Sequence, residues 1–145
     1  MLFRSAKIGT ETMWNDRIAI ARDGGLEALV DANMQRWFSP AFHQNRATEL
    51  GGFVSMFTRT PVAAYIGTGM AIRDADFRDQ APSISVPVTC VVGDQDGATP
   101  PELVESTAKL IPGATFEVIK DAGHIPCAEQ PAAVIAIIRA MMGKI

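Results

Sequence analysis

Two short motifs place a carboxylate and an imidazole just after strand-like segments of the chain. Asp96 follows residues 88–92, and His124 follows residues 115–119. An acyl-transfer triad needs an imidazole to take the proton of the nucleophile and a carboxylate to hold that imidazole in the correct tautomer. The pattern therefore predicts Asp96 as the orienting acid and His124 as the general base of such a triad.

Two other carboxylates compete with Asp96 for the role of the acid. Asp94 and Asp121 each lie close to a strand-like segment, where either side chain could cap a local turn. A histidine in a loop and an Asp-Gly pair are also common in ordinary turns. We favour Asp96 with His124 because both follow strand ends, the acid precedes the histidine, and the loop after Asp96 leads into a proline-capped helix.

The segment from residue 86 to 143 predicts the elements that would carry these side chains. Residues 88–92 are typical of a strand that is buried on both faces, residues 115–119 predict a second strand, and each is followed by a helical pattern. A helical crossover between two strands of one sheet makes them parallel. Parallel sheets bind ligands beyond the carboxyl ends of their strands, which is where Asp96 and His124 lie.

Local signals predict the bounds of the two helices in this unit. Thr99 to Glu102 matches a capping box with proline at the first helical position, and Pro112-Gly113 is expected to end that helix. Pro131 opens the last helix. Its buried stripe is expected to consist of Val134, Ile137, Ile138 and Met141.

The first 80 residues predict helices and no strand. Apolar residues recur at helical spacing in four segments, which begin at Thr10, near Leu26, before Leu50 and at the pair Thr60-Pro61. We therefore predict an α/β protein in which a helical region, residues 1–80, precedes a β-α-β-α unit with two parallel strands, residues 81–145.

The second of these helices is expected to end at Ser39-Pro40, which leaves His43 between helices. No acid or cysteine lies at ligand spacing from His43, so we expect no metal there. Cys90 and Cys127 fit free thiols, because Cys90 lies inside an apolar strand and neither cysteine has a metal-type spacing.

Composition excludes several classes of partner. The formal net charge is −3, with 13 Lys and Arg against 16 Asp and Glu, and the basic residues are scattered, so nucleic acid is not expected. No apolar run reaches the roughly 20 residues that span a bilayer. The first residues lack the basic-then-apolar layout of a signal peptide, so we expect a cytoplasmic protein that does not bind membranes.

The two motifs resemble those of the α/β-hydrolase superfamily, and the whole chain resembles its carboxyl-terminal half. The superfamily motifs are Gly93-x-x-Asp96, Thr99-Pro100-Pro101, Ala122-Gly123-His124 and Glu129-Gln130-Pro131. Within the superfamily the helical region is most similar to the cap of 3-oxoadipate enol-lactonases. The segments that carry this narrower resemblance are residues 5–10, 14–18, 36–40 and 71–76.

The resemblance implies hydrolytic ring opening of 3-oxoadipate enol-lactone in the β-ketoadipate route of aromatic catabolism, without a metal or organic cofactor. It also implies that residues from about 10 to 79 form a lid over the site. The lactone carries a carboxylate, so a lid arginine is expected to hold it by a bidentate pair. Arg73, Arg17 and Arg36 are candidates and Trp14 and Trp37 could line the pocket, although each also fits an ordinary helix-face charge or lid-core residue.

The sequence departs from the family at the nucleophile. The family carries its serine in a Gly-x-Ser-x-Gly elbow upstream of the cap, and none of the serines here has the flanking glycines; they are Ser5, Ser39, Ser55, Ser83, Ser85 and Ser106. We therefore expect no lactonase activity from the chain alone. Two strands are also fewer than a stable sheet usually needs, so we expect the chain either to pair with a partner chain that supplies the missing amino-terminal half or to be loosely folded.

Two alternatives remain open at this point. The chain could be a non-catalytic interaction module that keeps Asp96 and His124 as turn residues. It could also be part of a different α/β-hydrolase, acting on another ester or on a carbon-carbon bond.

Overall fold

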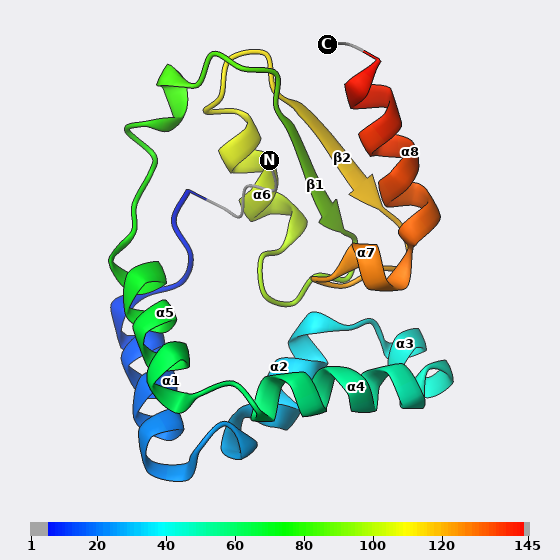
Figure 1. Ribbon diagram of the computed structural model, residues 1–145. Coiled ribbons are helices and arrows are strands. Elements are labelled where there is room, and N and C mark those ends of the chain that lie inside the picture. Colours follow the sequence, from blue (N-terminus) through cyan, green and yellow to red (C-terminus); the bar gives the residue numbers. More distant parts are fainter. Residues whose placement is uncertain (1–5, 144–145) are drawn as a thin grey trace.

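The computed structural model describes residues 6–143 of the chain (Figure 1). The described residues exclude 1–5 and 144–145, which are the outer ends of the two predicted regions. Ser5 is among the excluded residues. The helices are α1 (Glu11–Gly24), α2 (Val30–Trp37), α3 (Pro40–Asn45), α4 (Ala47–Thr58), α5 (Val62–Asp74), α6 (Pro101–Ala108), α7 (Pro126–Glu129) and α8 (Pro131–Met142), and the strands are β1 (Thr89–Gly93) and β2 (Thr115–Ile119).

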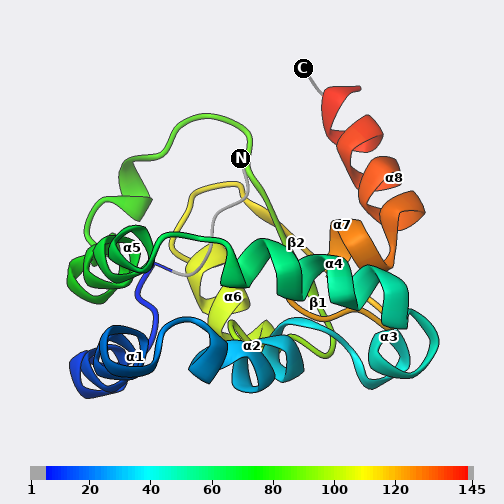
Figure 2. The same cartoon turned by 60° about the horizontal axis from the view of Figure 1, so that its bottom comes forward.

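The strand pair confirms the predicted β-α-β-α unit. β1 and β2 run parallel, with Thr89 opposite Thr115 and Gly93 opposite Ile119, and α6 connects them. Figures 1 and 2 show α6 on one side of the pair and α8 on the other. Helices α1 to α5 lie together beyond the carboxyl ends of both strands (Figure 1), so they cover the edge at which parallel sheets bind ligands.

Helix α1 begins and ends where the sequence predicts. The Thr10 side chain accepts a hydrogen bond from the Met13 amide, and Gly25 follows the helix with a φ of 72°. Glycine adopts this left-handed conformation without the steric cost of a Cβ atom. The next helical segment starts as a short 3-10 turn, Glu27–Leu29, before it continues as α2.

The predicted loop around His43 is wrong, because α3 occupies it. Helix α2 ends at Trp37, and Ser39 starts the next helix: its hydroxyl accepts a hydrogen bond from the Phe42 amide at 3.2 Å, and Pro40 is the first residue of α3. A serine followed by proline is a helix start as well as a helix stop. His43 therefore lies within a helix, with its Nε2 atom 3.0 Å from the Met34 carbonyl oxygen.

The predicted capping box at Thr99 is also wrong. Helix α6 begins at Pro101 with Pro100 in the cap position and no side-chain cap, and it ends at Ala108, before Pro112. The Thr99 hydroxyl instead donates to Asp96. Helix α5 similarly begins one residue later than predicted, at Val62.

Buried apolar side chains form two clusters. One lies among the helices α1 to α5 and centres on Leu26, Phe38 and Phe42, and the other lies between β1 and α6 around Cys90 and Val92. The division of the chain at residues 80 and 81 stays a prediction, and these two clusters are the packing that supports it.

The predicted buried stripe of α8 is not buried in this structure. Helix α8 has no buried residue, and Ile138 is 51% exposed. Within residues 6–143 the sheet has only β1 and β2, so α8 lies against a narrow strand pair rather than a wide sheet (Figure 1). Other exposed apolar side chains lie nearby, at Val118, Ile135 and Met142.

No helix within residues 6–143 is both long enough and apolar enough to span a membrane.

Candidate active site

The loops after β1 and β2 bring Asp96 and His124 into direct contact. The Nδ1 atom of His124 lies 2.8 Å from Oδ2 of Asp96, and the two side chains are 9% and 4% exposed. The rival carboxylates are placed elsewhere. An oxygen of Asp94 accepts the Ala122 amide, and Asp121 lies in the loop with a φ of 55°. The imidazole therefore meets the carboxylate that the sequence favours.

Three further donors fix the orientation of Asp96. Its Oδ1 atom accepts the backbone amides of Ala98 at 2.7 Å and Thr99 at 2.8 Å, while Oδ2 accepts the Thr99 hydroxyl at 2.9 Å. The Thr99 Oγ1 atom also lies 3.3 Å from Nδ1 of His124. Both carboxylate oxygens are thus saturated with donors, so the side chain is held in place by its own loop.

Electrostatics keep Asp96 ionised. Burial alone would raise the pKa of this carboxyl, but the hydrogen bond from His124, the Thr99 amide, the charge of His124 and the Ala98 amide together lower the pKa below its ordinary value. An ionised acceptor at Nδ1 favours the imidazole tautomer that carries its proton there. Nε2 of His124 is then the basic nitrogen, and within residues 6–143 it has no hydrogen-bond partner.

The loop that carries His124 is bonded to the junction between α2 and α3. The His124 amide donates to the Trp37 carbonyl oxygen at 2.8 Å. The buried carboxylate of Glu129 accepts the Gly123 amide at 2.6 Å on one oxygen, and on the other it accepts the amide and hydroxyl of Ser39 at 3.0 and 2.5 Å. A single carboxylate therefore joins the histidine loop to the helices above it.

Two glycines permit the loops to approach so closely. A Cβ atom on Gly93 would lie 2.2 Å from the Ala122 carbonyl oxygen, and one on Gly123 would lie 2.5 Å from the Trp37 carbonyl oxygen. Both neighbours are backbone atoms that cannot rotate away. Glycine at these positions lets the end of β1, the end of β2 and the α2–α3 junction pack against one another.

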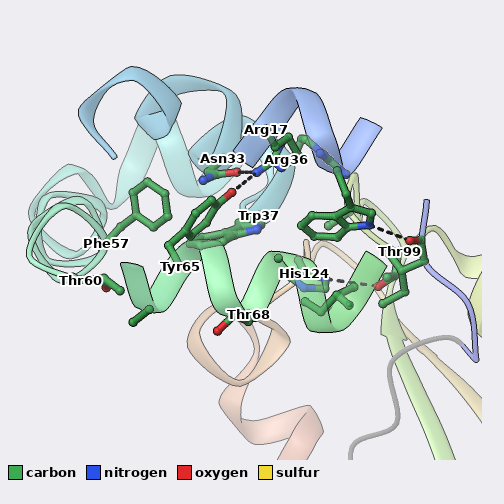
Figure 3. Close-up of a pocket in the computed structure, with 16 residues that line it drawn as sticks. Arg17, Asn33, Arg36, Trp37, Phe57, Thr60, Tyr65, Thr68, Thr99 and His124 are labelled. Atoms are coloured by element: carbon green, nitrogen blue, oxygen red, sulfur yellow. Dashed lines mark hydrogen bonds between the residues drawn. The ribbon is translucent and has the colours of Figure 1, made fainter. Parts of the chain in front are cut away.

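A pocket of about 350 Å³ lies between these loops and helices α1, α2, α4 and α5. His124 and Thr99 form part of its wall, and much of the rest is aromatic, as Figure 3 shows for Trp37, Phe57 and Tyr65. Its volume suits a small organic ligand. The acid–base pair therefore adjoins a partly open pocket whose wall is formed largely by the helical region.

The predicted substrate-contacting residues divide into two groups. Trp14 and Trp37 line the pocket, as do Arg17 and Arg36. Arg73 does not line it: its guanidinium pairs with Asp74, with a 2.7 Å Nε–Oδ1 distance, and donates to Asn15 at 2.8 Å. The structure therefore brings Trp14 and Trp37 to the site and leaves Arg73 outside it.

Sequence reasoning missed several polar residues of the pocket, among them Asn33 and Tyr65. The buried Asn33 is 1% exposed and accepts a hydrogen bond from Arg17, which also donates to the Tyr65 hydroxyl at 3.1 Å. The signal for Asn33 was its position, because it lies on the same helical face as Val30 and Trp37. A polar residue on the apolar face of a helix indicates a buried hydrogen bond or a polar site.

Among the residues the structure describes, no group of three or more His, Cys, Asp or Glu side chains is arranged to hold a metal ion.

Comparisons with known proteins show which family the chain resembles. The family model described as "alpha/beta hydrolase fold" matches residues 26–131. The chain is 33% identical to "3-oxoadipate enol-lactonase 1" of Acinetobacter baylyi over 141 residues, covering 97% of this chain and 53% of the relative. It is 30% identical to "3-oxoadipate enol-lactonase 2" of the same organism, covering 97% and 52%. The chain thus spans about half the length of the curated relatives it matches.

Solved structures of hydrolases are also similar to this chain. The enol-lactonase from Burkholderia xenovorans LB400 is 31% identical with a TM-score of 0.92, and the match covers 96% of this chain and 53% of that one. A thermophilic esterase from Thermogutta terrifontis is 26% identical with a TM-score of 0.86, covering 96% and 53%. These matches confirm the predicted partial α/β-hydrolase fold and the resemblance to enol-lactonases. The chain belongs to the α/β-hydrolase fold family.

Proposed function

We propose that this chain supplies the acid, the base and the lid of a hydrolase of the 3-oxoadipate enol-lactonase type. The observation that carries the proposal is the contact between Asp96 and His124 at the wall of a covered pocket. The relatives named above are an enol-lactonase pair and solved hydrolases that include an esterase. Ester or lactone hydrolysis is the chemistry that such a pair serves.

In the proposed reaction His124 carries one proton in each of two successive steps. Its Nε2 atom takes the proton from a nucleophilic hydroxyl as that oxygen bonds to the lactone carbonyl carbon, and it returns the proton to the ring oxygen as the ring bond breaks. Water then attacks the resulting acyl group while Nε2 takes a proton from that water. His124 returns this proton to the nucleophilic oxygen as the bond between that oxygen and the acyl carbon breaks, which releases the acid and restores the hydroxyl. Asp96 holds the ring nitrogen Nδ1 and stabilises the imidazolium that forms in each step.

The nucleophile is proposed to come from polypeptide beyond these 145 residues. No serine of the sequence lies between glycines in a Gly-x-Ser-x-Gly elbow. The same polypeptide would complete the sheet. In support, α8 buries none of its residues and Val118 of β2 is 45% exposed, which leaves apolar surface beside the strand pair for further elements.

The test combines this chain with a separately produced enol-lactonase segment that carries the Gly-x-Ser-x-Gly elbow, and measures hydrolysis of the enol-lactone. We expect turnover from the combination and none from this chain alone. In the combination, His124→Gln should lower turnover by about a thousandfold or more. His43→Gln is the matched control, because the only other histidine of the chain lies in α3 away from the pocket.

Two results would count against the proposal. Turnover by the chain alone that His124→Gln abolishes would show that the nucleophile is within the 145 residues. Turnover by the combination that survives His124→Gln would remove the histidine from the chemistry.

A further inference from the structure

Helix α2, which lies beyond the carboxyl ends of the strands (Figure 1), is bonded to the loops that carry Asp96 and His124. The last carbonyl groups of a helix have no partner within it, so they need donors from elsewhere. At the end of α2 the Arg36 carbonyl oxygen accepts the Gly97 amide at 3.2 Å, and the Trp37 carbonyl oxygen accepts the His124 amide at 2.8 Å. Two consecutive carbonyls of one helix therefore hold the loop of the acid and the loop of the base.

The contact between α2 and the loop of Asp96 is reciprocal and close. Nε of Arg36 donates to the Gly97 carbonyl oxygen at 3.2 Å, in addition to the hydrogen bond from the Gly97 amide. A Cβ atom on Gly97 would lie 3.2 Å from both the Cα atom and the carbonyl oxygen of Arg36. These are backbone atoms of a helix and cannot rotate away. The loop after β1 is therefore packed directly on the backbone of α2.

Two residues beyond α2, Ser39 holds the loop of His124 through Glu129. The Ser39 amide and hydroxyl donate to one oxygen of Glu129 at 3.0 and 2.5 Å, and the other oxygen accepts the Gly123 amide at 2.6 Å. Both side chains are buried, so water competes little for these hydrogen bonds. With the bond from the His124 amide to Trp37, they close a ring between the helical region and the loop after β2.

We propose that residues 36–39 set the separation of Asp96 and His124, and that Ser39, acting through Glu129, is a positioning residue for this pair. Loops are more mobile than the elements they join, so a 2.8 Å contact between two loops needs a shared support. The helical region would then hold the pair together as well as form the wall of the pocket. The consequence for catalysis rests on the proposed function, whereas the support of the Asp96–His124 hydrogen bond does not.

Proton NMR of the full 145-residue chain tests this support without turnover. A histidine Nδ1 proton that is donated to a buried carboxylate exchanges slowly with water and resonates far downfield. We expect this resonance from His124, and because the chain has only two histidines, its persistence in His43→Gln assigns it. Ser39→Ala removes the hydroxyl that holds Glu129, so this proton should exchange with water about tenfold faster, or more.

The matched control is Thr10→Ala. Ser39 also caps α3, and Thr10 caps α1 in the same way, so both changes remove a hydroxyl cap from the helical region. Thr10→Ala should leave the exchange of the His124 Nδ1 proton within about twofold of wild type. Circular dichroism checks that each variant folds, and Gly97→Ala, whose Cβ would press on Arg36, replaces Ser39→Ala if the latter does not.

Kinetics of the reconstituted enzyme separate positioning from substrate binding. Ser39 does not line the pocket, so Ser39→Ala should lower kcat by about tenfold and leave KM within about twofold of wild type.

Equal exchange of the Nδ1 proton in Ser39→Ala and wild type would overturn the proposal, and so would a Thr10→Ala variant as impaired as Ser39→Ala. Absence of the resonance from the wild-type chain would overturn it too, because residues 36–39 would then not hold the pair together. A failed reconstitution of hydrolysis would leave the NMR result intact.

Discussion

The Asp96 carboxylate is held in a single orientation by hydrogen bonds within the chain itself. Two amides and a hydroxyl from the following three residues fix both carboxylate oxygens, and His124 adds a fourth donor. The sequence predicted the acid and the histidine from their places after strands. The sequence could not predict the hydrogen bond from the Thr99 hydroxyl to Asp96, because a threonine before Pro100 is also typical of a helix cap.

The hydrogen bonds to Asp96 predict how stability depends on pH. The pKa of the folded-state carboxyl lies below its ordinary value of 3.8, so the unfolded chain takes up the proton first as the pH falls. The contribution of Asp96 is complete above about pH 4 and is lost as the pH falls through the lowered pKa. Urea denaturation should show that Asp96→Asn destabilises the chain at neutral pH and that the difference shrinks in acid.

The control for this measurement is the exposed Asp23, for which Asp23→Asn should follow the wild-type pH profile. A difference between Asp96→Asn and wild type that stays constant from neutral pH to about pH 2 would contradict the direction of the pKa shift.

Replacing Gly123 is expected to destabilise the chain. In Gly123→Ala the new Cβ atom would lie 2.5 Å from the Trp37 carbonyl oxygen and 2.9 Å from a Glu129 carboxylate oxygen. We expect a loss of about 1–3 kcal/mol in the free energy of unfolding. Gly52→Ala is the matched control, because that helical glycine has no atom within 4 Å of the new Cβ. It should raise stability by about 0.5–1 kcal/mol, and equal effects of the two changes would refute the account of Gly123.

At the scale of elements, the site depends on contacts between segments that the sequence cannot pair. Periodicity predicted both strands and most helices, and the cap at Thr10 is confirmed. Helix α3 was missed because Ser39-Pro40 fits a stop and a start alike. The contact of Glu129 with Ser39 joins residues 90 positions apart, and a local sequence pattern cannot predict such a pairing.

Glu129→Gln tests that junction. The carboxylate accepts three hydrogen bonds from Gly123 and Ser39, and an amide would face one of these donors with its own NH2 group. We expect a loss of about 1–3 kcal/mol in stability and faster exchange of the Gly123 and His124 amides. The exposed Glu117→Gln on β2 is the control. Unchanged exchange at His124 would show that Glu129 does not hold the loop.

At the scale of the whole molecule, the helical region and the contact between β1 and α6 are well packed, whereas α8 is not. Buried aromatic rings fill the core among α1 to α5, whereas α8 contributes no buried residue. The buried stripe predicted for α8 assumed a wide sheet, and the two described strands do not provide one. The predicted burial of this stripe is therefore wrong for the described residues, because helical periodicity shows an apolar face but not whether another element covers it.

The exposed apolar face of α8 is expected to be covered when the sheet is completed. Ile138→Asp should change the stability of the chain alone by less than about 1 kcal/mol, because Ile138 is 51% exposed. It should nevertheless reduce turnover in the reconstituted enzyme, since the completed sheet would bury an unpaired charge. Ala136→Asp, at another exposed position of α8, is the control. Full reconstitution by Ile138→Asp would mean that this face is not covered.

We propose that Asp96, and neither Asp94 nor Asp121, orients His124 for hydrolysis. The most direct measurement is the kcat of the reconstituted enzyme on the enol-lactone with Asp96→Asn, Asp94→Asn or Asp121→Asn. An asparagine that leaves the geometry intact but favours the wrong histidine tautomer lowers kcat by about ten-thousandfold in a serine protease, and we expect a loss of that order for Asp96→Asn. The other two variants should stay within about tenfold of wild type, whereas a larger loss from either of them than from Asp96→Asn would contradict the claim.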